Sequence, residues 1–450
     1  MKRTEIDMIH GSLADKIVLF AIPLAASSVL QQLFNAADLA VVGRFASSVA
    51  MAAVGSNASV ISLIVNLFLG LSVGANVLIA KLIGAGKREL IQDAIHTVIS
   101  LALICGFALT VIGFFIAPQI LKLMGAPENV IALATIYLRI YFVGMPVILI
   151  YNYGSAILRS KGDSRRPFLA LAAAGVVNVL LNLLFVVVFH LHVIGVALAT
   201  VLSNCLSAGL VLWFLMKEED PFTLHLRQLR LRRDYVADLM RIGLPAGLQG
   251  MVFSVSNVVI QSAINSFGAA CIAGNTAAQN IDFISYCVIN AFTQAALTFT
   301  SQNYGAGNFD RIKKVFRIAL GLGLAIDLVV LGLLILFRYP IMSLFTTDPE
   351  VLHYAMIRFN SAVRLHFIIT FYEISGGAIR GMNHSLAPAM ISILGTCAFR
   401  LFYVLVIFPH FNTPEMLLWV YPFSWILTAV VMLSCFFLIY RKEFRRYSEK

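Results

Sequence analysis

The apolar segments of this sequence constrain its fold more than any other feature, because each is as long as a membrane is thick. A helix needs about 20 residues to cross roughly 30 Å of hydrocarbon. Twelve apolar runs reach that length, and they are continuous rather than alternating, which excludes a transmembrane β-barrel. The sequence therefore predicts an all-α integral membrane protein with twelve transmembrane helices. The runs cover approximately residues 15–41, 50–80, 94–118, 129–157, 166–189, 193–216, 241–266, 273–302, 314–338, 351–378, 386–409 and 416–440.

The charged residues support this interpretation and orient the helices. Only 12% of the residues are charged, about half the share that is usual in a soluble protein. With the N-terminus inside, 26 Lys and Arg residues fall in cytoplasmic segments and three in the loops on the other side. This asymmetry predicts that both termini are cytoplasmic and that the protein resides in the cytoplasmic (inner) membrane, with the lipid bilayer as its surroundings. It also accounts for the net charge of +11 without a nucleic-acid partner.

The chain contains a repeat of itself. Residues 156–168, "AILRSKGDSRRPF", resemble residues 377–389, "GAIRGMNHSLAPA", with an offset of 221 residues. The tight-turn sequence "IGAGK" at 83–87 resembles "YGAGN" at 304–308 with the same offset. The first six spans are thus repeated as the last six. Because each copy has an even number of spans, both copies have the same orientation in the membrane. Parallel repeats of this kind are a recurrent architecture of transporters.

The repeat divides the chain into two predicted lobes of six helices each. The N-lobe covers residues 1–220 and the C-lobe covers residues 221–450. We expect a monomer that is not an enzyme, because the sequence lacks the HExxH, GxSxG and GxxxxGK[ST] motifs. His190 and His192 form an HxH pair in a short loop without a third ligand nearby, so we expect neither a metal site nor a cofactor.

Polar residues inside the predicted spans are the candidates for function. A charge at the bilayer centre costs about 2.5–3.5 kcal/mol on insertion scales, so it usually faces a cavity. In the first span, Gln31, Asn35 and Asp38 are spaced i, i+4 and i+7 and share one helix face. In the fifth span, Asn178 and Asn182 form an i, i+4 pair. The amides also fit interhelical hydrogen bonding, whereas Asp38 carries a charge that such bonding does not need.

The second half contains further candidates, each with a structural alternative. Gln261 belongs to a polar stripe of the seventh span, and Asp282 and Glu373 are candidate cavity residues. Basic residues occur in the same spans, so internal ion pairs are the alternative for both acids. Asp327 lies in an otherwise plainly apolar span, and we expect it to be structural.

One proline lies inside the first span of each half. Pro23 and Pro245 each remove a backbone hydrogen bond and kink the helix. Such a kink is either a static bend or a hinge, and the duplication of the proline is compatible with both.

These segments together resemble the multidrug and toxic compound extrusion (MATE) family, in its bacterial drug-exporter branch. The resemblance covers essentially the whole chain and rests on "IPLAASSVLQQLFNAADLAVVGRF", "AAVGSNAS", "YLRIYFVGMP", "ILRSKGDSRRP", "GLPAGLQ" and "YPFSW". It implies a V-shaped pair of six-helix lobes and antiport of organic cations against protons or sodium. It also implies that Asp38 binds the coupling cation, and it places Pro23 and Gln31 on family positions of the first helix.

Two departures from the family pattern bear on the coupling ion. The fifth-helix motif of the family, Asn followed four residues later by Asp, appears here as Asn178 and Asn182, without the acid. The acid associated with sodium coupling on the seventh helix is absent from residues 242–266. Protons are therefore the favoured coupling ion. Sodium, bound by Asp38 and the oxygens of both asparagines, is the alternative.

The sequence thus predicts a proton-coupled exporter of amphipathic organic cations. The candidate cation-coupling residues are Asp38, Asn178 and Asn182, the candidate cavity residues are Gln31, Asn35, Gln261, Asp282 and Glu373, and the candidate hinges are Pro23 and Pro245. A flippase for lipid-linked saccharides, as found among related folds, is the alternative. It would require basic residues around its cavity, for which Arg139 and Arg400 are the best candidates.

Overall fold

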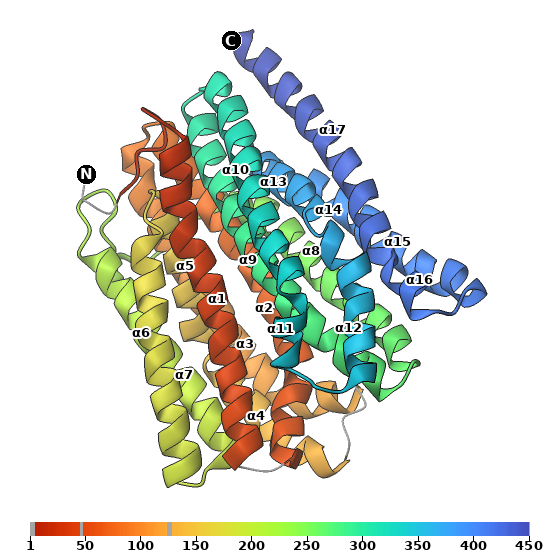
Figure 1. Cartoon of the computed structure of the whole chain (residues 1–450). Coiled ribbons are helices and arrows are strands. Elements are labelled where there is room, and N and C mark those ends of the chain that lie inside the picture. The colour runs from red at the N-terminus through yellow and green to blue at the C-terminus, as the bar shows by residue number, and fades with distance from the viewer. Residues whose placement is uncertain (1–4, 46–47, 124–127, 450) are drawn as a thin grey trace. The chain divides into compact units, whose positions relative to one another are not determined.

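The structure is a computed structural model of the whole chain, which describes residues 5–45, 48–123 and 128–449. These residues are almost entirely helical and contain no strand (Figure 1). Two compact units are present. Unit 1 comprises Ala26–Leu244 with the N-terminal residues up to Ile6, and unit 2 comprises Asp7–Ala25 and Pro245–Lys450.

The first half of the chain folds into seven α-helices. They are α1 (Ala14–Phe45), α2 (Ser48–Gly84), α3 (Arg88–Leu123), α4 (Glu128–Val143), α5 (Met145–Ser160), α6 (Arg165–Asn182) and α7 (His192–Met216). A π-helical segment, η1 (Leu183–Val188), extends α6, and a 3-10 turn, η2 (Leu226–Gln228), precedes the second half. Within unit 1, α6 lies along α7, and α3 packs against α4 and α5.

The second half contains more interruptions. Its α-helices are α8 (Arg233–Asn265), α9 (Ala269–Gly305), α10 (Phe309–Leu336), α11 (Arg338–Ser343), α12 (Pro349–Ser361), α13 (Ile368–Gly381), α14 (Leu386–Ser392), α15 (Phe399–Phe402), α16 (Pro414–Leu418) and α17 (Val420–Ser448). Short 3-10 and π-helical segments join them: η3 (Val363–Leu365), η4 (Ile393–Ala398), η5 (Tyr403–Ile407) and η6 (Phe408–His410). Within unit 2, α9 packs against α10, α12 and α13 and is the central helix.

The number of unbroken spans is smaller than the twelve apolar runs. Among the described residues, ten helices are long and apolar enough to cross a membrane, or eleven when α4 and α5 count as one span bent by 47°. The bend falls at Gly144, just before Pro146, which lacks an N–H group and favours the start of a new helix. The run at 351–378 is divided by η3 into α12 and α13. Apolar length therefore locates these two segments correctly but does not show that they are interrupted.

The tight turns predicted from the repeat are confirmed. Gly86 after α2 and Gly307 after α9 have φ angles of +67° and +69°, in the left-handed region that glycine adopts without strain. In both turns the next helix starts within two residues. The two copies of the repeat therefore use the same device to reverse the chain.

Two helices belong to both compact units. α1 passes from unit 2 to unit 1 at Ala25/Ala26, and α8 passes from unit 1 to unit 2 at Leu244/Pro245. A side-chain contact illustrates why the first half of α1 belongs to unit 2. Phe20 makes an edge-to-face contact with Phe299 of α9, with ring centroids 5.8 Å apart. Both prolines predicted to kink their helices, Pro23 and Pro245, lie inside continuous helices within two residues of these crossing points.

Candidate cation site

The carboxylate of Asp38 meets two polar side chains from other helices of unit 1. Asn182 at the end of α6 donates through Nδ2 to Asp38 Oδ1. The hydroxyl of Thr200 on α7 lies 3.5 Å from Asp38 Oδ2 and donates more closely, at 2.9 Å, to the carbonyl of Val196. The first, fifth and sixth predicted spans therefore converge on one acid.

The two asparagines predicted as site residues are paired with each other. Asn182 Nδ2 lies 3.2 Å from Asn178 Oδ1, and both side chains are buried. Asn182 Oδ1 is also buried, and it has no hydrogen-bond partner in the described part of the chain. A buried carbonyl oxygen without a donor is unfavourable, so this atom is available to accept a hydrogen bond.

No strong positive charge neutralises Asp38 within the part of the chain that the structure describes. Its hydrogen bonds come from an amide and a hydroxyl, and no Lys or Arg forms an ion pair with it. Tyr137, buried on α4, interacts with it electrostatically. A carboxylate with only neutral partners can change its charge without breaking an internal ion pair.

A contact between the ring of Phe34 on α1 and Gly175 on α6 positions the site. Gly175, Asn178 and Asn182 are spaced i, i+3 and i+7 on one buried face of α6. A Cβ atom on Gly175 would collide with the ring of Phe34, which lies one helical turn before Asp38 on α1. Glycine at position 175 therefore lets α1 come near enough for Asp38 to reach Asn182.

The helix after this site is not regular. The π-helical segment η1 follows Asn182 directly, and π-helical turns are frequently found at functional sites. The corresponding part of the second repeat is π-helical as well, in η5 (Tyr403–Ile407).

The other predicted cavity residues lie apart from this hydrogen-bond network. Gln31 and Asn35 have exposed side chains on α1, and Gln261 donates to Asn265 of its own helix at 2.9 Å. These three residues stay candidates for a substrate path.

Of the two acids of the second half, Asp282 adopts the structural alternative in this conformation. Asp282 on α9 accepts two hydrogen bonds from Arg358, at 3.0 and 2.8 Å, and both side chains are buried. Glu373 on α13 interacts electrostatically with Arg380, which donates to Gln249 at 2.6 Å. Internal pairing accounts for Asp282, and a cavity role for either acid stays a prediction.

Sequence reasoning missed Thr200 and Gly175. A threonine in an apolar span usually bonds to the carbonyl four residues earlier, as Thr200 does, and so carries no functional signal by itself. Gly175 ends the run "LAAAG", in which several small residues fit a helix contact equally well. Only the identity of the facing helix distinguishes these residues from their neighbours.

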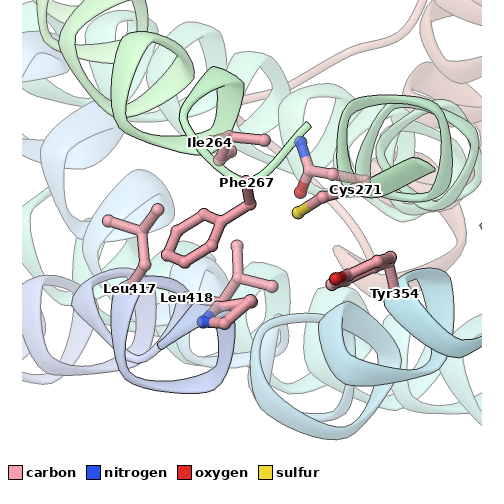
Figure 2. Close-up of a pocket in the computed structure, with 8 residues that line it drawn as sticks. Ile264, Phe267, Cys271, Tyr354, Leu417 and Leu418 are labelled. Carbon is pink, nitrogen blue, oxygen red and sulfur yellow. The ribbon is translucent and has the colours of Figure 1, made fainter. Parts of the chain in front are cut away.

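One small cavity lies inside unit 2 (Figure 2). It has a volume of about 10 Å³, room for roughly one water molecule. In Figure 2, Cys271 and Tyr354 lie on one side of it and Leu417 and Leu418 on the other. A space of this size does not admit an amphipathic drug, so we assign no substrate to it.

Comparison with known proteins identifies the family. The profile of the MatE family matches residues 23–184 and again residues 245–406, which is more than half of the chain. The chain belongs to the MatE family. The two matched segments start 222 residues apart, in agreement with the internal repeat, and this MatE protein is a membrane transporter and not an enzyme.

Relatives of this MatE protein differ in the substrates that their names give. The chain is 29% identical over 436 residues to the probable multidrug resistance protein YoeA of Bacillus subtilis, covering 94% of each chain. It is 26% identical over 330 residues to a protein of Shewanella oneidensis named FAD transporter, covering 71% of this chain and 72% of that protein.

A solved structure shares the fold. It is described as the outward-facing conformation of a multidrug resistance MATE family transporter, with a TM-score of 0.89, 24% identity and coverage of 100% of both chains. This agreement confirms the all-α membrane fold predicted from the apolar runs.

Proposed function

We propose that this MatE protein exports amphipathic organic cations across the cytoplasmic membrane in exchange for protons. The relatives named as multidrug resistance proteins support efflux of varied small molecules. The excess of Lys and Arg in one set of loops supports cytoplasmic termini. In this proposal the protein acts as a monomer and needs no cofactor besides the coupling ion.

The observation that carries the proposal is the environment of Asp38. Its carboxylate is bound by Asn182 and Thr200, which are neutral donors, and the buried oxygen of Asn182 beside it has no partner among the described residues. When ionised, Asp38 attracts a drug cation. When protonated, it is neutral, releases the drug and donates its new O–H to the oxygen of Asn182. Drug and proton thus compete for one carboxylate, which is the requirement for antiport.

The energetics favour a one-for-one exchange. A monovalent drug cation that leaves the cell works against the membrane potential at about 2.3 kcal/mol per 100 mV. One proton that enters offsets this term fully. The remaining driving force is the pH difference, about 1.36 kcal/mol per unit. The exchange is then electroneutral and is driven by pH.

Sodium is the alternative coupling ion. Oxygen ligands for it would come from Asp38, from Asn182 Oδ1 and from Asn178, whose Oδ1 already accepts the amide of Asn182. The helix α8 has no acid between Pro245 and Asn265. Because one carboxylate and few free oxygens are a poor set of ligands for a hard cation, we place the proton first.

Movement would be concentrated at the two duplicated prolines. α1 and α8 change from one compact unit to the other within two residues of Pro23 and Pro245, where a backbone hydrogen bond is missing. This coincidence supports the interpretation of both prolines as hinges. The substrate would then pass the polar side chains Gln31, Asn35, Gln261, Asp282 and Glu373 during transport.

An anionic substrate is the second candidate, and buried arginine supports it. Arg400 is 1% exposed, donates to Ser424 and Asn257, and lies over the rings of Phe253 and Tyr421, all of which are uncharged. A flippase for lipid-linked saccharides or a dinucleotide carrier, the latter suggested by the relative named FAD transporter, would use such a charge. Arg139, the other predicted candidate, instead donates to the Phe114 carbonyl at 3.0 Å.

Dye efflux from proteoliposomes under defined gradients tests the proposal. The parent should move a fluorescent organic cation when a pH gradient is imposed, and a sodium gradient at constant pH should have no effect. Asp38→Asn keeps the size and hydrogen bonding but fixes the charge at zero. We expect normal membrane levels, weaker dye binding and efflux reduced to the background of empty liposomes.

The matched control is Asp15→Asn, the same change at an exposed position of the same helix. It should transport like the parent. Efflux by Asp38→Asn at the parental rate, normalised to folded protein, would show that Asp38 only packs. Efflux driven by sodium alone would show that sodium, and not the proton, is the coupling ion.

A further inference from the structure

A second buried carboxylate lies in unit 2. Asp327 on α10 is 0% exposed and lies in the part of this helix, residues 318–336, that is otherwise apolar. Ser285 on α9 donates to Asp327 Oδ1 at 2.5 Å, and Thr370 on α13 donates to Oδ2 at 3.2 Å. Two neighbouring helices, α9 and α13, therefore direct hydroxyl groups at one acid in the interior of the unit.

A histidine extends this network. The hydroxyl of Ser285 lies 2.9 Å from Nδ1 of His366, which is 5% exposed at the break between η3 and α13. The imidazole also makes a T-shaped contact with the Trp425 ring, with centroids 5.5 Å apart. Asp327, Ser285 and His366 thus form a continuous chain of hydrogen bonds that is closed off from solvent.

The chain can hold one proton in either of two arrangements without moving a heavy atom. In the first, Asp327 is protonated and donates to Ser285, whose hydroxyl donates to neutral His366. In the second, Nδ1–H of His366 donates to Ser285, whose hydroxyl donates to ionised Asp327. The first arrangement becomes the second when one proton passes from Asp327 to Ser285 while another passes from Ser285 to His366. Both arrangements have a net charge of zero.

The surrounding charges do not neutralise Asp327. Asp282 and Arg358 interact with His366 but form an ion pair with each other. On α13, Glu373 and Arg380 interact with each other. In the described part of the chain, no Lys or Arg forms an ion pair with Asp327. The other titratable side chains on the elements packed against α10 are Cys271, Tyr286, Cys287 and Tyr304 of α9, Arg364 of η3, Tyr372 of α13, and Arg338 and Tyr339 of α11.

Loss of the shared proton would therefore leave a net negative charge in an apolar interior. Burying an unpaired charge costs several kcal/mol, so the network is stable with its proton and is under strain without it. This is the arrangement expected of a site that takes up and releases a proton when its access to water changes.

The repeat shows that the fold does not require these polar residues. With the offset of 221 residues, the counterparts of Asp327, Ser285, His366 and Thr370 are Gly106, Ile64, Met145 and Leu149. The first half packs the same helices with apolar residues at all four positions. A purely structural explanation of the network thus has to explain why only one copy contains it.

We propose that Asp327, Ser285 and His366 form a second proton-binding site, in unit 2, which holds one exchangeable proton, with Thr370 as a positioning residue. The site is separate from Asp38, and the proposal does not rest on Asp38 being the coupling residue. It replaces the structural role that the apolar sequence around Asp327 suggests.

Infrared difference spectroscopy of the protein in lipid nanodiscs tests this site directly. The carbonyl stretch of a protonated carboxylic acid disappears when the group ionises. We expect a pH titration of the parent to show a band that is missing in Asp327→Asn and unchanged in Asp38→Asn. Asp310→Asn, the same substitution at an exposed position of α10, should leave this band as in the parent.

Ser285→Ala keeps the proposal testable if Asp327→Asn fails to fold. It keeps the carboxyl group and interrupts the chain to His366, so the band should remain and its titration midpoint should shift by about one pH unit, as expected for one lost hydrogen bond. The proposal is overturned if no band titrates that depends on Asp327. It is also overturned if Ser285→Ala titrates like the parent.

Discussion

At the scale of single residues, unit 1 contains a cluster of ion pairs centred on Glu218, which lies outside the membrane-spanning segments. Glu218, just after α7, accepts from Lys161 at 2.7 Å and forms an ion pair with Arg166. Lys161 also contacts Glu5 at 2.7 Å. Burial opposes ionisation of the Glu218 carboxyl, but the hydrogen bonds and charges of Lys161 and Arg166 outweigh it and lower the pKa of Glu218. This cluster ties the end of α7 to the turn between α5 and α6.

The lowered pKa of Glu218 predicts a pH dependence of stability. A carboxyl group whose pKa is lower in the folded state stabilises the fold above the unfolded pKa, about 4.3 for Glu, and this contribution is lost as the pH falls through the folded pKa. Glu218→Gln should therefore destabilise the protein by about 2 kcal/mol at pH 7, and the difference from the parent should shrink in acid below pH ~4. Thermal unfolding at both pH values measures it.

The neighbouring carboxylate supplies the control for this prediction. Glu219 is exposed, and Glu219→Gln should unfold like the parent at both pH values. An equal loss of stability in Glu218→Gln at neutral and acidic pH would mean that packing of the side chain, and not its charge, stabilises the turn.

At the scale of elements, the contact between α1 and α6 decides whether the Asp38 site can form. The ring of Phe34 occupies the space that a side chain on Gly175 would need. The helices cannot separate at this point without moving Asp38 away from Asn182, because Phe34 and Asp38 lie on one face of α1. The absence of a side chain at Gly175 thus determines whether Asp38 can reach Asn182.

A compensating pair of substitutions tests this contact. Gly175→Ala should lower dye efflux at least several-fold at normal membrane levels, because the new methyl group pushes α1 away from α6. Adding Phe34→Ala makes room for the methyl group and should restore part of the lost activity, as a double-mutant cycle between contacting residues requires.

A Gly→Ala substitution at a position without close neighbours shows whether an effect on efflux comes from packing or from helix propensity. Gly209 on α7 has open space around its Cβ position, and Gly209→Ala should be neutral. If Gly175→Ala is as active as Gly209→Ala, the contact does not determine the site.

The elements themselves could largely be predicted from the sequence, whereas the partners of each polar side chain could not. Apolar length and the repeat give the helices and the turns at Gly86 and Gly307, because both depend on local sequence. Thr200, Gly175 and the Ser285–His366 contact depend on which helix faces which, and this is a property of tertiary packing. A charged residue such as Asp38 is conspicuous in any apolar helix, but a hydroxyl that bonds to its own backbone is not.

At the scale of the whole molecule, the predicted orientation can be measured without reference to transport. After replacement of the six native cysteines, Gln228→Cys, exposed in the segment between α7 and α8, should react with an impermeant thiol reagent only in opened cells. Phe411→Cys, exposed between η6 and α16, should react in intact cells. Labelling of position 228 in intact cells would contradict the topology that the basic residues predict.

The division of α1 between the two compact units has a consequence for how the protein is made. Asp7–Ala25 is synthesised well before the rest of unit 2, which begins only at Pro245. Phe20 therefore cannot pack against Phe299 until residues 26–244 have been synthesised and inserted. Unit 1 is in a similar position, because its last helical segment, up to Leu244, is continuous with the first helix of the second half. Neither copy of the ancestral duplication contains all the parts of its own unit, so the loss of one copy would leave an unfinished domain rather than a smaller transporter.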